Sequence, residues 1–500
     1  MTAEPVDFRD IQGLVRFGYN ALTDASFLLL KISDPVAARA WLKTAPISTA
    51  EEVSRPPLTA LQVAFTREGL EAIGVTEDLL EGFSAEFLSG MTGQESRSRR
   101  LGDVGASSPL GWQWGRPGNA PHAVVMIYAQ PGHLHGWTET IRNEHWSTAF
   151  EVIDCLSTSN LGGKEPFGFT DGISQPTPDW KRQRNPQGDQ LEYGNLLALG
   201  ELLLGYPNEY GKYTDRPLVP DDALSSSILR EAEDQPGKRD FGRNGSFLVF
   251  RQLRQDVQGF WRFVDTQTSS DARARQRLAE SMVGRKMDGT PLLPLSADPI
   301  AGIDAKASAQ NQFTYNLDGN GDRCPFGAHI RRANPRNADL PSSSGLVDRL
   351  MHMLGFGNAS YRDDVIASTR FHRMIRRGRE YGPRLTPDEA SAGASDTSEH
   401  GIHFICIAAN ILRQFEFVQN SWVMNTKFDA LTEQSDPLLG NRAEVAGCPV
   451  TSTFVSPERT GARTRTMGMP QFVTVRGGAY FFLPSIRALR FLASIGGHSW

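Results

Sequence analysis

The sequence is poor in cysteine. Its four cysteines, Cys155, Cys324, Cys406 and Cys448, are spread over 500 residues and form no C-x-x-C pair. Disulfide frameworks, structural zinc sites and covalent haem attachment through C-x-x-C-H all depend on paired or clustered cysteines, so the sequence argues against each of them. Such sparse usage is typical of a protein in a reducing compartment.

Long hydrophobic runs are also missing. A transmembrane helix needs about 18 or more mostly apolar residues in a row, and no run in the sequence approaches that length. The first seven residues, MTAEPVD, are acidic and contain no basic n-region, apolar h-region or twin arginine. We therefore expect a cytoplasmic protein that does not associate with a membrane.

Neither sign of charge is in large excess. The formal net charge is -5, which gives no electrostatic reason to expect a nucleic-acid partner. Hydrophobic residues make up 39% of the chain and charged residues 22%, as in ordinary globular proteins that bury a large core. A length of 500 residues indicates more than one domain.

Apolar runs and helical patterns follow the order β-α-β-β-α-β twice along the chain. In the first copy, strands are expected at 27–32, 61–65, 123–128 and 150–156, and helices at 35–42 and 133–146. In the second copy, strands are expected at 246–251, 373–376, 404–408 and 472–483, and helices at 256–266 and 411–423. The Ser/Gly/Arg-rich segment 89–120 is expected to be a loop. The pattern predicts an α+β fold of two ferredoxin-like halves, residues 1–215 and 245–500, joined by a connection at 216–244.

The most informative stretch is RCPFGAHIRRANPR, residues 323–336, which places His329 between a Pro/Gly turn and a basic cluster. A neutral imidazole in such a position can bind a metal, and nearby arginines can hold the carboxylates of a cofactor that carries the metal. The alternative is a structural histidine beside a solvated basic loop.

Two further stretches carry polar residues at turns. In GFTDG, residues 168–172, Asp171 lies between glycines, which alone is most simply a turn. The stretch RRGREYG, residues 376–382, begins with Arg376, where the strand expected at 373–376 ends in arginines. Alone, this stretch is most simply a solvated charge cluster.

Together, the three stretches resemble the dye-decolourising (DyP-type) haem peroxidases. Asp171 matches the family's GxxDG motif, His329 its proximal haem ligand and Arg376 its distal arginine. The resemblance continues through residues 10–13, 414–419 and 477–484 and so covers essentially the whole chain, which is similar to the larger members with long insertions. It implies two ferredoxin-like halves in a dimeric α+β barrel-like fold, with haem held by the C-terminal half.

The resemblance also implies a function. A protein of this kind uses hydrogen peroxide to oxidise bulky aromatic dyes or phenolics by one-electron steps through a ferryl intermediate. It would bind one non-covalent haem b per chain through His329, with Asp171 as acid/base and Arg376 stabilising charge. We expect peroxide and an aromatic reductant as partners, and a monomer or homodimer.

Other site residues follow from the same resemblance. Asn334 and Arg336 would lie near the haem propionates, and Ile402 and Phe404 would form the apolar distal wall, with His403 pointing away from it. We expect Glu416, on the helix at 411–423, to accept a hydrogen bond from His329; its alternative is an ordinary surface glutamate. Many relatives carry a histidine at the position of Pro166, so the propionate contact made there is in doubt.

Three alternative functions are open on the sequence alone. The first is a haem carrier or a deferrochelatase-like protein that releases iron, against which Asp171 and Arg376 argue. The second is a thiolate-haem monooxygenase with Cys324 as the iron ligand. The third is an α+β binding protein without a cofactor.

Overall fold

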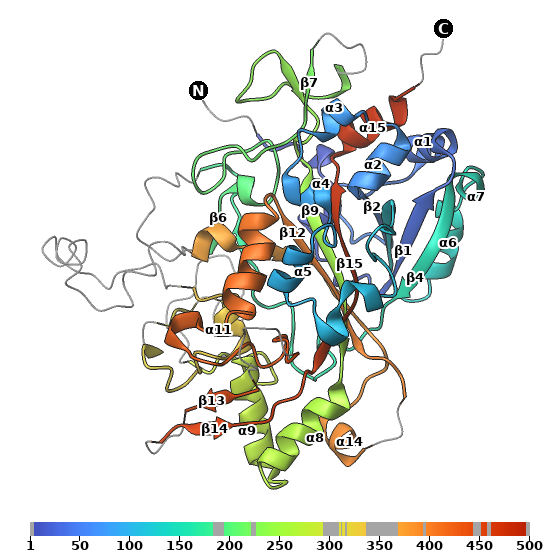
Figure 1. Cartoon of the computed structure of the whole chain (residues 1–500). Coiled ribbons are helices and arrows are strands. Elements are labelled where there is room, and N and C mark those ends of the chain that lie inside the picture. Colours follow the sequence, from blue (N-terminus) through green and yellow to red (C-terminus); the bar gives the residue numbers. More distant parts are fainter. Residues whose placement is uncertain are drawn as a thin grey trace, which may run out of the picture.

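A computed structural model describes residues 5–183, 195–221, 227–293, 310–311, 313–315, 318–336, 369–393, 397–443, 452–457 and 462–496 (Figure 1). Cys448 and residues 222–226 of the expected connection therefore lie outside the described residues. None of the described helices is both long and apolar enough to cross a membrane.

One antiparallel sheet of nine strands runs through the described part of the molecule. The N-terminal half supplies β1 (Asp24–Ile32), β2 (Thr59–Phe65), β3 (Ala123–Ala129) and β4 (Phe150–Ser157), in the spatial order β2-β3-β1-β4. The C-terminal half supplies β9 (Ser246–Gln255), β10 (Ile375–Arg376), β12 (Gly401–Ala408) and β15 (Val473–Leu483), in the order β10-β12-β9-β15. The remaining strand, β11 (Arg379–Tyr381), pairs with β12. Each half thus has the strand order 2-3-1-4, and the predicted pair of ferredoxin-like halves is confirmed.

The two halves meet at the centre of this sheet. Strand β15 pairs with β9 over ten residue pairs and reaches β2 through the pair Phe482↔Phe65. The ring of Phe482 lies 4.9 Å from that of Phe83 and 5.6 Å from that of Phe241. The halves therefore share a continuous core, although the residue limits expected for them stay a prediction.

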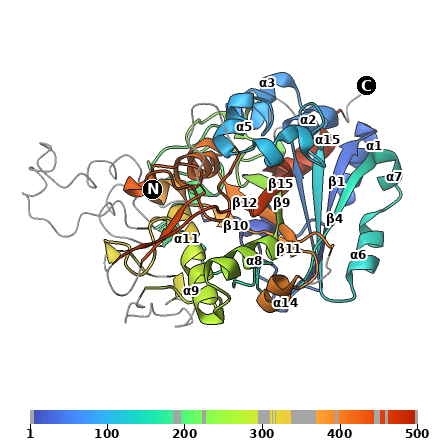
Figure 2. The same ribbon diagram turned by 60° about the horizontal axis from the view of Figure 1, so that its bottom comes forward.

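Helices cover the sheet on both halves (Figure 2). Near β1 and β4 lie α1 (Pro35–Thr44), α6 (Leu134–Ile141) and α7 (Trp146–Ala149), while α8 (Val257–Gln267), α9 (Ala272–Val283) and α14 (Pro387–Ala392) gather at the other half. Because both faces of the central strands are covered, a strand there can be apolar throughout, as in β3, where every residue is buried. Helix α1 begins where Pro35 follows Asp34, whose carboxylate caps the amide of Ala37 at 2.8 Å.

Four predicted elements differ in detail from the structure. The helix expected at 133–146 is divided into α6 and α7, and the strand expected at 373–376 is the two-residue β10. The loop expected at 89–120 contains α5 (Glu95–Leu101), and the helix expected at 411–423 is wound in the wider π geometry as η9 (Leu412–Glu416) and η10 (Val418–Val423). Helix α5 and the π turns of η9 determine where Glu416, an expected site residue, points.

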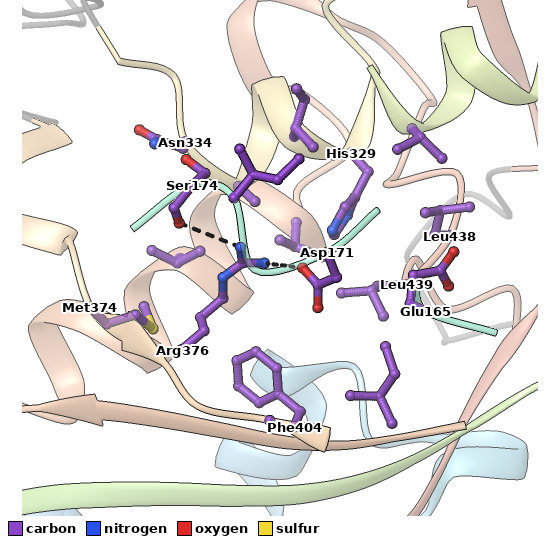
Figure 3. A pocket seen from close by; sticks show the side chains of 18 of the residues that line it. Glu165, Asp171, Ser174, His329, Asn334, Met374, Arg376, Phe404, Leu438 and Leu439 are labelled. Carbon is purple, nitrogen blue, oxygen red and sulfur yellow. Dashed lines mark hydrogen bonds and ion pairs between the residues drawn. The ribbon is translucent and has the colours of Figure 1, made fainter. Parts of the chain in front are cut away.

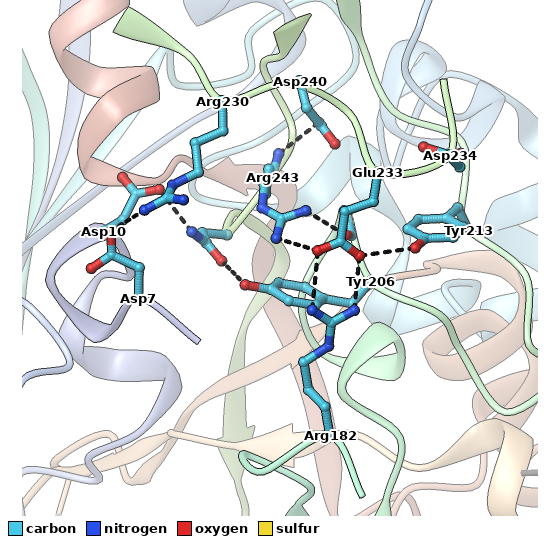
Figure 4. A network of polar contacts seen from close by, with 12 residues as sticks. Asp7, Asp10, Arg182, Tyr206, Tyr213, Arg230, Glu233, Asp234, Asp240 and Arg243 are labelled. Carbon is cyan, nitrogen blue, oxygen red and sulfur yellow. Dashed lines mark hydrogen bonds and ion pairs between the residues drawn. The ribbon is translucent and has the colours of Figure 1, made fainter. Parts of the chain in front are cut away.

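The described part of the connection is held by ion pairs and polar side chains (Figure 4). The carboxylate of Glu233 accepts from Arg182 and Arg243, and the side chain of Asn244 joins the Tyr206 hydroxyl (2.6 Å) to Asp10 (2.7 Å). Because Asp10 belongs to the N-terminal segment, this network ties the connection back to the first half.

Candidate active site

A cavity of about 280 Å³ lies beside β12 of the C-terminal half and is also lined by residues of the segment 165–176 in the N-terminal half (Figure 3). Its walls are largely apolar and include Phe167, Phe169, Leu253, Phe415, Trp422 and Leu439. The polar groups that reach it come from residues far apart in the sequence, among them Asp171, His329 and Arg376. An apolar pocket with a few convergent polar groups is the usual form of a small-molecule or cofactor site.

His329 begins α11 (His329–Ala333), and its imidazole points into the cavity (Figure 3). Its Nδ1 lies 2.9 Å from Oδ2 of Asp436, a fully buried carboxylate. Burial alone raises the pKa of Asp436, but the charge and hydrogen bond of His329, aided by the amide of Leu439, lower it below its usual range. An ionised Asp436 accepts the Nδ1 proton and leaves Nε2 as the ring nitrogen able to bind a metal.

The basic cluster after His329 is structural. Arg332 is fully buried and donates to the backbone oxygens of Trp422 (3.0 Å) and Asn425 (2.9 Å). Arg331 is also buried and pairs with Asp318 at 3.1 Å. These contacts fix α11 against the segment that carries Asp436, and the alternative of a solvated basic loop is wrong.

Asp171 is carried by a loop with glycines on both sides. Gly168 (φ 98°) and Gly172 (φ 76°) both have the left-handed backbone that favours glycine. Before them, the carboxylate of Glu165 accepts from the amides of Phe167 (3.0 Å) and Phe169 (2.9 Å). Burial raises the pKa of Glu165 to about 7, although these hydrogen bonds alone would lower it. The GxxDG sequence therefore describes a fixed turn that presents Asp171 to the cavity.

Arg376 lies at the end of β10 and faces Asp171, with 3.5 Å between its Nη1 and Oδ1 of Asp171 (Figure 3). The side-chain amide of Gln175 connects their two segments. Gln175 accepts from the amide of Arg376 (2.9 Å) and donates to its carbonyl (3.1 Å), as a neighbouring strand would. This double hydrogen bond fixes the Asp171 loop to the strand that carries Arg376.

Ile402 and Phe404 line the cavity from alternate positions of β12. His403 between them points to the opposite face, where its Nε2 lies 2.9 Å from the carbonyl oxygen of Ser157 and its ring packs on Tyr381. The predicted orientation of His403 is confirmed.

Asn334 and Arg336 also line the cavity, on the side of Ser174 and Arg285, which we call its polar end. Arg336 has a left-handed backbone (φ 62°), which is costly for a residue other than glycine. Its guanidinium donates to the carbonyl of Phe313 (3.1 Å) and to Oγ of Ser174 (3.2 Å). The structure thus brings both residues to the cavity, while their contact with propionates stays a prediction. Pro166 does not line this cavity but a smaller pocket next to it.

The prediction that Glu416 accepts from His329 is wrong. Glu416 is buried at the end of η9, outside the cavity lining, where it pairs with Arg97 of α5 (2.8 Å) and accepts from the Tyr480 hydroxyl (2.9 Å). The alternative, a surface glutamate, is equally wrong. The π turns of η9 direct the side chain to α5 and β15, and α5 lies in the segment expected to be a loop.

Cys324 is not placed to bind a metal in this cavity. It is buried next to Gly284, outside the cavity lining, and burial raises the pKa of its thiol to about 12. A thiol that stays protonated is a poor metal ligand. The structure therefore gives no support to the thiolate alternative.

Sequence reasoning missed several residues of this site. Asp436 is 107 positions from His329, and a lone Asp before Pro437 gives no signal that it orients an imidazole. Gln175 and Glu165 flank the GxxDG motif in the segment KEPFGFTDGISQP, where other polar residues are just as frequent, so no signal distinguishes them. Arg285, which also lines the cavity, follows Gly284 at the end of α9 without any motif.

Comparisons with known proteins find full-length relatives, although no family model matches the chain. The chain is 29% identical to the dye-decolorizing peroxidase msp1 of Mycetinis scorodonius over 98% of its length and 88% of that protein's. It is 28% identical to a dye-decolorizing peroxidase of Auricularia auricula-judae, over 98% of this chain and 87% of the relative.

Solved structures give the same result. The crystal structure of a fungal DyP-type peroxidase from Auricularia auricula-judae is 27% identical, with a TM-score of 0.70, and the match covers 98% of this chain and all of that one. A dye-decolorizing peroxidase in complex with 2,6-dimethoxyphenol is 25% identical with a TM-score of 0.69, again over 98% and 100% of the two chains. Full-length similarity in sequence and in fold points to one family: the chain resembles the DyP-type, or dye-decolorizing, peroxidases.

Proposed function

We propose that the cavity binds one non-covalent haem b per chain through Nε2 of His329, and that the chain uses hydrogen peroxide to oxidise bulky aromatic dyes or phenolics by one-electron steps. The observation that supports this most is the arrangement of the polar groups. An imidazole oriented by a buried carboxylate and an aspartate–arginine pair reach the same largely apolar cavity (Figure 3). A haem carrier has no need of such an acid/base pair.

The residues of the cavity fit haem. The Nε2 atom of His329 is left free for iron by the Asp436 hydrogen bond, and the apolar walls suit the faces of a porphyrin. Asn334 and Arg336 at the polar end are suited to its carboxylates. When bound, haem supplies the redox chemistry of peroxide reduction and substrate oxidation.

Asp171 and Arg376 have different roles in the reaction with hydrogen peroxide. The ionised carboxylate of Asp171 takes the proton from one peroxide oxygen and returns it to the other, which then leaves as water. The guanidinium of Arg376, 3.5 Å from that carboxylate, stabilises the negative charge that develops on the departing oxygen. Ile402 and Phe404 exclude bulk water and bulky substrates from this side of the cavity.

The test is the absorption spectrum of the purified protein before and after peroxide, compared with that of His329→Ala. We expect an imidazole-type haem spectrum that changes with peroxide, and haem that acidic butanone extracts completely. His329→Ala should lose most of its haem, whereas the exposed control His133→Ala should keep it. Normal haem content and an unchanged spectrum in His329→Ala would show that another residue is the ligand.

A further inference from the structure

Arg285 lines the same cavity and has no role in the function proposed so far. It follows Gly284, which ends α9 with a left-handed backbone (φ 95°). Its side chain is buried, with 5% of the residue exposed. Its Nη1 donates to the carbonyls of Gly289 (2.8 Å) and Gln310 (2.9 Å), which fixes the guanidinium in place.

Among the described residues, the other end of this guanidinium has no partner. Nη2 is buried without a hydrogen bond, and no carboxylate in the described ranges forms an ion pair with Arg285. Several other buried arginines have a carboxylate partner, as Arg331 has Asp318 and Arg251 has Asp103, whereas Arg332 is held by backbone oxygens. A buried cation without a counter-charge is costly, because it has lost its water and gained no anion.

The surroundings of Arg285 are cationic. Burial, followed by the charges of Arg336 and Arg376, lowers the pKa of Arg285 to about 10, so the side chain still carries its charge at neutral pH. The ring of Phe313 lies 5.4 Å from the guanidinium carbon of Arg285 and 3.8 Å from that of Arg336. Two guanidinium groups thus lie against one aromatic ring at the polar end of the cavity.

We propose that the free Nη2 of Arg285 binds a carboxylate that enters the cavity, and that this carboxylate belongs to the porphyrin. A carboxylate supplies the missing counter-charge and a planar acceptor that matches a guanidinium. The same chemistry is offered by a free carboxylate of an aromatic substrate, and the two sources are distinguished by experiment. The porphyrin assignment rests on the proposed haem site.

The test compares two porphyrins that differ only in this group. Haem-free protein is titrated with iron protoporphyrin IX and with its dimethyl ester, for the wild type, Arg285→Met, Arg285→Lys and the exposed control Arg273→Met on α9. Arg285→Met should weaken binding of the diacid by about ten- to a hundredfold, the range for a hydrogen bond to a charged group. Its affinity for the diester should equal that of the wild type, which also shows that the variant is folded.

The other two variants test whether the effect depends on a buried cation at position 285. Arg285→Lys should recover part of the diacid affinity, because it keeps a buried cation, and Arg273→Met should bind both porphyrins like the wild type. Equal losses for diacid and diester in Arg285→Met would overturn the proposal, since the effect would then not depend on a carboxylate.

Benzoate binding separates the two carboxylate sources. If Arg285→Met binds both porphyrins normally but no longer binds benzoate, Arg285 binds the carboxylate of a substrate and not that of the porphyrin. If neither porphyrin binding nor benzoate binding changes, Arg285 binds no carboxylate. A wild type that takes up neither porphyrin contradicts the proposed haem function instead, and the benzoate titration of the haem-free proteins then decides the role of Arg285.

Discussion

Asp171 and Arg376 form an ion pair of 3.5 Å at the cavity, and both side chains are partly exposed. In the proposed function both act on the same O–O bond. Asp171→Asn should slow the reaction with peroxide by about 10²–10⁴-fold, the usual value of one positioned proton carrier. Arg376→Leu should cost a comparable amount, about 3–4 kcal/mol in the barrier.

Because the two residues act together, their losses should not add. Stopped-flow measurement of the peroxide reaction in both single variants and the double variant checks this, with the exposed Asp322→Asn as a control. Logarithmic losses that simply sum in the double variant would contradict the shared role.

Glu165 predicts a pH dependence of stability in the haem-free protein. Its folded-state pKa is raised to about 7 from 4.5, chiefly by burial, so between these values the folded state holds a proton that the unfolded state has released. The free energy of unfolding of the wild type should therefore fall, relative to Glu165→Gln, as the pH rises from about 4.5 to about 7. Each pKa unit corresponds to about 1.4 kcal/mol.

Urea unfolding of both proteins at pH 5 and pH 8 measures this difference. Glutamine lowers the absolute stability by placing a donor near the amides of Phe167 and Phe169, so only the change with pH is informative. A constant difference would show that Glu165 has the same pKa in the folded and unfolded states, and a difference that grows in favour of the wild type at pH 8 would show that folding lowers its pKa; either result contradicts the prediction.

How far the site was predictable depends on how local each contact is. His329, Asp171 and Arg376 lie in short motifs whose local structure the sequence carries, such as the positive φ of Gly168 and Gly172. The partner of His329 is set by tertiary packing instead: Asp436 reaches it only because Arg332 fixes α11 to residues 422–434. No spacing rule predicts such a contact, and Glu416, which has the right chemistry on a nearby helix, points elsewhere.

At the scale of elements, one buried ion pair joins three of them. Arg97 of α5 pairs with Glu416 of η9, which accepts from Tyr480 of β15. Arg97→Met should destabilise the fold by about 3–5 kcal/mol, because it leaves a buried carboxylate without its cation. Arg100, 3.8 Å from the same carboxylate and 45% exposed, should matter by no more than about 1 kcal/mol when changed to Met.

The same variants separate structural from cofactor roles. In haem-loaded protein, Arg97→Met should leave the absorption spectrum unchanged, whereas Asp436→Asn should shift it, because Asp436 orients His329. A spectral shift in Arg97→Met with none in Asp436→Asn would restore Glu416 as the partner of His329.

Among elements, strands were predicted best. Strand β3 is a continuous apolar run, and β15 ends in one, AYFFL, as fits a sheet covered on both faces. Helix α5 was missed because its sequence, ESRSRRL, is almost entirely polar and shows no apolar face, although Arg97 and Leu101 are buried. Polar buried contacts, rather than hydrophobic periodicity, stabilise this helix.

For the whole molecule, the single sheet predicts that the halves are stabilised together. Phe482 is fully buried where β15 meets β2. Phe482→Ala should cost about 3–5 kcal/mol. Hydrogen exchange should then show reduced protection in β3 of the first half and in β12 of the second. Loss of protection in β12 alone would mean that the halves are energetically independent. The half-exposed Val152→Ala on the edge strand β4 serves as the control.

The position of β15 has a consequence for biosynthesis. It ends at residue 483, later than any other described strand, yet it lies in the middle of the sheet between β9 and β2. While the ribosome is still translating, β2 and β9 present unpaired edges that attract other extended chains. Val473 of β15 also lines the cavity, so the pocket is incomplete until that strand emerges. In the proposed function, haem can therefore be held in the complete pocket only after β15 has emerged, and until then the centre of the sheet is open to other extended chains.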